Sequence, residues 1–339
     1  MRYRFWSMFS FIILTAFLAG CASTVPTAHI DAFGQSTKSI SDKIDAVLIT
    51  YIDAKVAEEL ETIAQEDTSP PPPLTFANLK RLEPFTTKDA IKGLAVTRAN
   101  KALGAYGASL SNLAKAGNQV DIDLATANLY SSLRSLDEQY KILADTDSGV
   151  FGDNLPSIAQ AVAIVGNIYT EHKKWEAVSK IVQSSNEPIL EITDAIEKTL
   201  DKDEVISSAL RRYNHIKVQG MINDYQDTFH KLDRTARLKK LNAIYEAYTL
   251  FLASNLQIQE ASKAVKAIRT AHNELVTELN KPQTEIEAIQ AIIIKVQAYD
   301  KHYDNFYDLL NSCTTEIIKD PEKQGTLKCK ESKPTENEA

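Results

Sequence analysis

The strongest constraint on the fold is the near absence of helix-breaking residues from a long central stretch. Between Ser157 and Ser312 the glycines and prolines are Gly166, Gly220, Pro188 and Pro282. A β architecture needs frequent turns, and turns depend heavily on Gly, Pro and short polar residues. The stretch therefore predicts long helices joined by few turns.

Apolar residues recur at alternating spacings of three and four, which is typical of amphipathic helices packed side by side. No segment keeps the strict alternation of a half-buried strand. The sequence thus predicts an all-α fold, an elongated antiparallel helical bundle with coiled-coil-like packing. The stripes expected in its core include Ile49, Ile52, Val56, Leu60 and Ile63; Ala99, Leu103, Tyr106, Leu110 and Leu113; Leu129, Leu133, Leu136, Tyr140 and Leu143; Ile189, Ile192, Ile196 and Leu200; Leu238, Leu241, Tyr245, Tyr248 and Leu252; Ile258, Ala261, Val265, Ile268, Leu275 and Leu279; and Ile289, Ile292, Val296, Tyr299, Tyr303, Phe306 and Leu310.

The boundaries of this bundle follow from local composition. We expect a first helix over 37–66, then a Pro-rich linker over 67–86, because four consecutive prolines form a stiff polyproline II spacer. The bundle itself is expected over 87–318. Within it, the segment from Arg234 to Asn280 would form a helix of about 70 Å if unbroken. Small residues at 105–108 would allow close helix contact.

The first 20 residues have the pattern of an export signal. Arg2 and Arg4 precede the 14-residue apolar run Phe5–Leu18, which at about 1.5 Å per residue is short for a bilayer span. The run ends in Leu18-Ala19-Gly20-Cys21, which resembles the lipobox of bacterial lipoproteins. The resemblance implies cleavage before Cys21 and acylation of Cys21 by palmitate-type chains, and two or three chains give stable attachment. The alternative is an ordinary signal peptide with a chance cysteine.

The same resemblance suggests where the protein is located. In such lipoproteins an Asp after the acylated cysteine favours inner-membrane retention, whereas this chain has Ala22. The resemblance therefore implies a lipid anchor in the outer membrane with the body facing the periplasm, although a lipobox also fits a Gram-positive surface. Residues 21–36 show no apolar periodicity, so we expect them to form a flexible, lipidated tether.

Two further cysteines remain, Cys313 and Cys329. In an oxidising compartment they are expected to form a disulfide, which would tie the tail over 319–339 to the last helix. A loop of that size would contribute about 3 kcal/mol in the chain-entropy model. The alternative is two free thiols. Beyond Glu331 the polar, charged composition predicts disorder.

Motifs for catalysis or cofactor binding are missing. The chain has no phosphate-binding loop, no Gly-x-Gly-x-x-Gly, no His-Glu-x-x-His and no Gly-x-Ser-x-Gly. We therefore predict that it is not an enzyme and holds no cofactor or metal. The single histidines are expected at the surface or on helix flanks; they are His29, His172, His215, His230, His272 and His302.

Two charged clusters have alternative interpretations. Asp300, Asp304 and Asp308 lie four residues apart beside His302, so they form either a face that binds a divalent cation or a solvated acidic edge. The basic run from Lys231 to Lys240 either contacts an acidic partner or a phosphate-bearing lipid head group, or is a solvated helix face.

The net charge of −7 disfavours nucleic-acid binding. An anchor, a long helical body and the missing motifs favour a non-catalytic, membrane-anchored periplasmic scaffold or adaptor lipoprotein of the bacterial cell envelope, with an envelope protein as partner. The first alternative is a helical bundle that binds a ligand or peptide in a tyrosine-lined groove. The second is a membrane-active helical protein, for which the uncharged but polar stretch Asn154–Thr170 is a poor span.

Overall fold

The computed structural model describes residues 27–65, 87–152, 171–201, 204–281, 284–312, 317–319 and 327–329. The predicted export signal, Cys21, the Pro-rich segment 67–86, the uncharged stretch Asn154–Thr170, Cys313 and the end of the tail lie outside these residues.

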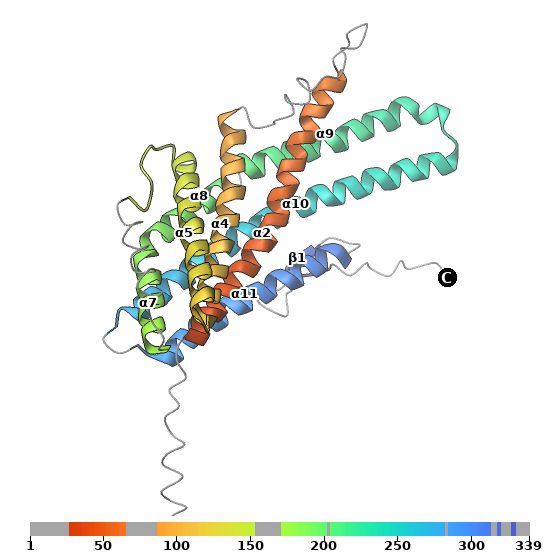
Figure 1. The fold of residues 1–339 in the computed structure, drawn as a ribbon. Coiled ribbons are helices and arrows are strands. Elements are labelled where there is room, and N and C mark those ends of the chain that lie inside the picture. Colours follow the sequence, from red (N-terminus) through yellow and green to blue (C-terminus); the bar gives the residue numbers. More distant parts are fainter. Residues whose placement is uncertain are drawn as a thin grey trace, which may run out of the picture.

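The described part of the chain is an all-α bundle, as predicted (Figure 1). Its helices are α2 (Thr27–Gln65), α4 (Lys88–Lys115), α5 (Gln119–Ala144), α7 (Glu171–Ser184), α8 (Asn186–Leu200), α9 (Val205–Thr228), the short 3-10 helix η1 (Phe229–Lys231), α10 (Arg234–Leu279) and α11 (Ile286–Ser312). Two three-residue strands, β1 (Ile317–Lys319) and β2 (Leu327–Cys329), pair antiparallel in the tail. The sequence prediction of no strand was wrong here, where the β-branched pair Ile317 and Ile318 favours an extended chain.

Helix α2 packs against α4 at the centre of the body, and small residues allow the two backbones to approach closely. A Cβ built on Gly34 would lie 2.4 Å from the carbonyl oxygen of Gly107, and one on Gly107 would lie 2.7 Å from the carbonyl oxygen of Gly34. Gly104 faces the Ser41 side chain in the same way. The close contact predicted around residues 105–108 is thus confirmed.

The start of α2 corrects the predicted tether over 21–36 and the predicted first helix over 37–66. Helix α2 begins at Thr27, and Ile30 and Phe33 are fully buried. The apolar spacing did not predict the first turns of α2. Ser36 and Thr37 are buried there, at core positions where the pattern needs an apolar residue. At a close helix crossing, small polar residues fit where leucine would not.

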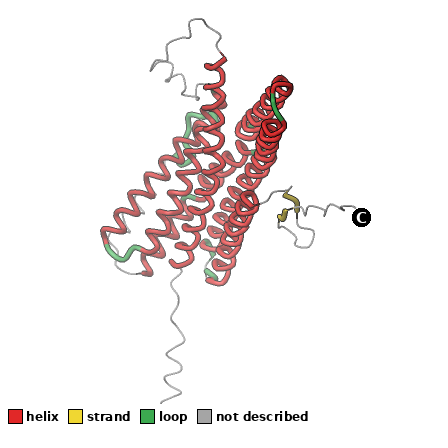
Figure 2. Tube along the Cα trace, turned by 90° about the vertical axis from the view of Figure 1, so that its right-hand side faces the viewer, coloured by secondary structure: helices red, strands yellow, loops and turns green. Residues whose placement is uncertain are grey.

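Helices α9 and α10 form a long antiparallel hairpin that extends away from the body (Figure 1). Figure 2 shows its two helices side by side, joined by a short loop at the tip. Helix α10 is unbroken over its 46 residues, which corresponds to about 69 Å and confirms the predicted long helix. Helix α8 ends at Leu200, and Asp201 after it is extended.

Candidate functional site

One of the fully buried polar side chains is His272, which contradicts the surface or helix-flank position expected for it. His272 is 0% exposed and packs beside Phe33 and Tyr106. Its Nε2 lies 2.9 Å from the Tyr106 hydroxyl, and its Nδ1 lies 3.1 Å from Oδ1 of Asn186. Burial lowers the pKa of His272 to about 3, so the ring is neutral, and a proton on Nδ1 lets the ring donate to Asn186 and accept from Tyr106.

The Tyr106 hydroxyl also lies 2.9 Å from Oγ of Ser185, so the network joins α4, α10 and the junction of α7 with α8. Burial raises the pKa of the Tyr106 hydroxyl, which therefore stays protonated. Because Tyr106, Ser185 and His272 are all 0% exposed, a substrate cannot reach them. The network holds three parts of the core together and does not form a site.

A lysine occupies the proposed cation face of α11. Nζ of Lys43, on α2, lies 2.6 Å from Oδ1 of Asp300 and 2.7 Å from Oδ1 of Asp304, and Ser39 donates to Asp300 at 2.9 Å. Burial opposes the charge of Lys43, but the hydrogen bonds to the two aspartates outweigh it and raise the pKa of Lys43. Asp308 is exposed. Within the described residues no three His, Cys, Asp or Glu side chains are placed to hold a metal ion.

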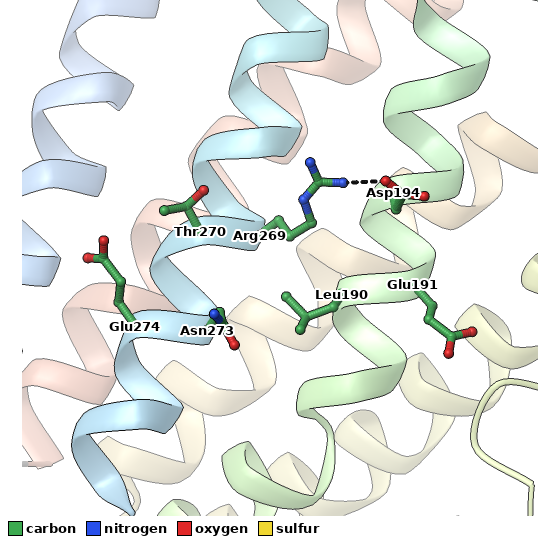
Figure 3. A pocket seen from close by; sticks show the side chains of 7 residues that line it. All are labelled: Leu190, Glu191, Asp194, Arg269, Thr270, Asn273 and Glu274. Atoms are coloured by element: carbon green, nitrogen blue, oxygen red, sulfur yellow. Dashed lines mark hydrogen bonds and ion pairs between the residues drawn. The ribbon is translucent and has the colours of Figure 1, made fainter.

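An open groove lies between α8 and α10, and the sequence patterns did not predict it (Figure 3). Its lining residues are Leu190, Glu191, Asp194, Arg269, Thr270, Asn273 and Glu274.

The charges of this groove are paired within the protein. Arg269 contacts Asp194 at 2.7 Å and Glu197 at 2.5 Å. Glu191 accepts a hydrogen bond from the Tyr140 hydroxyl at 2.7 Å. Since these groups already form ion pairs and hydrogen bonds within the protein, a charged ligand would have to displace an existing partner.

The surface that stands out is the outer part of the hairpin, which we call the arm and define as Arg211–Ala253. In α9 the last buried residue is Leu210, and in α10 the first is Ser254, so no residue of the arm is buried. The stripe Leu238, Leu241, Tyr245, Tyr248 and Leu252, predicted to lie in the core, is 40% to 59% exposed. That prediction was wrong because no described element covers this face, although the spacing of its apolar residues is that of a helix stripe.

Local interactions fix the tip of the arm. Asp233 caps α10 by accepting a hydrogen bond from the Ala236 amide at 2.8 Å. The Arg237 guanidinium lies 4.1 Å from the centre of the Phe229 ring and donates to the Leu232 carbonyl at 2.9 Å.

Lys240 crosses to α9, where it contacts Asp224 at 2.5 Å and donates to Thr228 at 2.9 Å. Arg234 and Lys239, from the same basic run, are exposed. The predicted basic run therefore has two roles, since Arg237 and Lys240 hold the tip together while Arg234 and Lys239 present charge to solvent.

The arm is basic in an acidic chain. Its residues carry eight lysines and arginines against four aspartates and glutamates, a net charge of +4, whereas the whole chain has −7. This contrast was the one signal in the sequence that set the arm apart from the core helices.

Cys329 ends β2, where it pairs with Ile317, and it is disulfide-bonded. Its predicted partner Cys313 lies outside the described residues, so the pairing stays a prediction.

Comparison with models of known protein families, with curated proteins and with solved structures finds no match. Among the described helices, none has an apolar stretch long enough to cross a membrane.

Proposed function

We propose that the protein acts by contact, as a non-catalytic helical scaffold or adaptor of the bacterial cell envelope, with the arm as its contact surface. The observation that supports this most is the arm itself, two helical segments without a buried residue that expose a continuous apolar stripe. A monomer gains nothing from exposing such a stripe to water, and stripes of this kind usually mark binding surfaces.

The proposal includes a lipid anchor at Cys21 in the outer membrane, with the body in the periplasm, and a disulfide between Cys313 and Cys329.

The position of α2 bears on how far the arm would lie from such an anchor. The start of α2 packs beside the inner half of α10, where the rings of Phe33 and His272 are 5.9 Å apart. From His272 to Arg234 the helix extends about 57 Å. An anchor six residues before Thr27 would hold one end of the body at the membrane and leave the arm far from it.

Site-specific photocrosslinking in intact cells tests the proposal. A photoreactive residue at Tyr245, on the arm, is expected to capture a protein, whereas one at Val120, exposed on the body, is not. Equal or absent capture at the two positions would contradict the assignment of the arm as the contact surface.

The lipid anchor is tested separately. The Cys21→Ser variant should be released from the membrane, and the intact mass of the wild-type protein should show a chain that begins at Cys21 and carries acyl groups.

A ligand-binding bundle is the competing function, and the groove between α8 and α10 is where it would bind. A small molecule that copurifies with the protein and is lost in an Arg269→Ala variant, without any arm crosslink, would favour this alternative.

A further inference from the structure

A second unpartnered face lies on α2, on the part of the helix from Ile49 to Leu60. We call it the acidic face and define it as Ile49, Asp53, Val56 and Leu60. Ile49 and Leu60 are 47% and 49% exposed, Asp53 is exposed and Val56 is half-buried. At 100° per residue, these four positions fall within about 60° of one another on the helix. Like the arm stripe, this region was predicted to be core and is not covered.

The acidic face cannot be covered by the arm of the same molecule. Glu58 lies nine residues after Ile49, which places it about 180° away around the helix. Glu58 contacts Arg212 of α9 at 2.9 Å, so the side of α2 that meets the hairpin is the opposite side. Tyr51 and Ala54 face the body and are buried. No described element of the same chain covers the acidic face, so it is open to a second molecule.

The acidic face and the arm stripe are complementary in charge. Residues 46–65 of α2 carry four acids and one lysine, and Asp53 lies within the face itself. The arm carries +4, and Arg234 lies four residues before Leu238, in line with the stripe. Two arms would repel each other, whereas an arm and an acidic face attract.

The spacing of apolar residues also matches between the two faces. The arm stripe repeats at spacings of three and four over 238–252, and the acidic face repeats at four, three and four over 49–60. Narrow stripes with this repeat suit the seam between two helices, whereas a helix lying on a bilayer needs a broader apolar side with basic residues along its polar side. Within the arm, the bases of α10 gather instead at its tip, over 234–240.

We infer that the arm stripe of one copy packs against the acidic face of a second copy. The inference rests on the proposed function, since it identifies the partner of the arm. If the arm of each copy packs on the acidic face of the other, the assembly closes as a dimer. If each arm packs on the acidic face of a further copy, the assembly extends as an open chain. Copies anchored in one membrane would meet at a high effective concentration, so a weak contact is sufficient.

Sedimentation velocity of the full mature chain, made soluble by Cys21→Ser, tests the inference. The mass should rise with protein concentration, and salt at about 0.5 M should weaken the association. Reversing the arm charges (Arg234→Glu with Lys239→Glu) or those of α2 (Asp53→Lys with Glu59→Lys) should each weaken it about tenfold, and combining the two should restore it.

A matched control, Glu176→Lys with Glu287→Lys, makes the same charge change on exposed acids of α7 and α11 and should leave the association unchanged. Circular dichroism should show the same helical signal and melting for every variant. A photoreactive residue at Tyr245 should give a self-crosslink that mass spectrometry maps to residues 49–61.

Three results would overturn the inference. The chain stays monomeric at every concentration, or the combined charge reversal fails to restore association, or the arm binds vesicles containing phosphatidylglycerol while the protein stays monomeric. If it fails while arm crosslinks to a different protein persist in cells, the proposed function stands. If the arm captures nothing, both fail.

Discussion

The two halves of α10 have the same spacing of apolar residues and opposite environments. In the inner half Ile258, Val265 and Ile268 are buried, whereas in the outer half Leu238 and Tyr245 are more than half exposed. The inner half contacts α2, α8 and α11, whereas the outer half contacts α9 and η1. Spacing therefore shows which residues share a face, while burial depends on whether another element covers it.

The largest expected difference comes from truncating one branched aliphatic side chain to alanine in each half. Ile268→Ala should lower the free energy of unfolding by about 2–5 kcal/mol, because it leaves a cavity in a packed core. Leu241→Ala should change it by less than about 0.5 kcal/mol, because Leu241 is 45% exposed and its truncation leaves no cavity in a packed core. Urea unfolding followed by circular dichroism measures both. Equal losses would mean that the arm stripe is buried in solution.

Glycines in the two regions should respond to alanine in opposite directions. Gly34→Ala places a Cβ against backbone atoms of α4, so we expect a loss of about 1–3 kcal/mol. Gly220 lies in α9, where an added Cβ would meet no atom within 4 Å, so Gly220→Ala should raise the unfolding free energy by about 0.5–1 kcal/mol through helix propensity. Thermal unfolding of both variants checks this, and stabilisation by Gly34→Ala would refute the close contact.

The buried histidine should make the body sensitive to acid. The folded protein holds His272 with a pKa near 3, whereas the unfolded chain takes up a proton below the ordinary value of 6.5. Unfolding is therefore favoured as the pH falls below 6.5, by at most about 1.4 kcal/mol per pH unit from this residue.

His272→Gln should be less stable at neutral pH, because the Tyr106 hydroxyl loses a partner, and its stability should fall less steeply with acid. Urea unfolding between about pH 7 and pH 5 compares the two slopes. Identical slopes in the variant and the wild type would show that His272 is not held neutral in the core.

The smallest effect needs no mutation. Backbone amides of 234–253 should exchange hydrogen faster than those of 258–279 in the same helix, because only one neighbouring helix protects the outer half. Hydrogen exchange with mass spectrometry resolves the two segments. Under conditions that favour association, exchange over 238–252 and 49–60 should slow together, and slowing in only one of them would argue against their pairing.

Much of the fold could be predicted from the sequence. The helical class, the length of α10 and the core stripes of α4, α5 and inner α10 depend on local spacing and on scarce helix breakers, and the structure confirms them. The start of α2 could not be predicted, because Gly34, Ser36 and Thr37 hide its buried side. The close approach of α2 to α4, where Gly34 and Thr37 meet Gly107, makes small residues suitable for this part of the core.

The sequence by itself determined which residues line up on each helix, because that follows from the geometry of a single helix. It also marked the arm as basic. Only the tertiary structure decided that Lys43 pairs with Asp300, 257 residues away, that His272 is buried, and that the faces at 49–60 and 238–252 stay uncovered. Each of these outcomes depends on which helix lies opposite, and that neighbour is set by the packing of the whole chain.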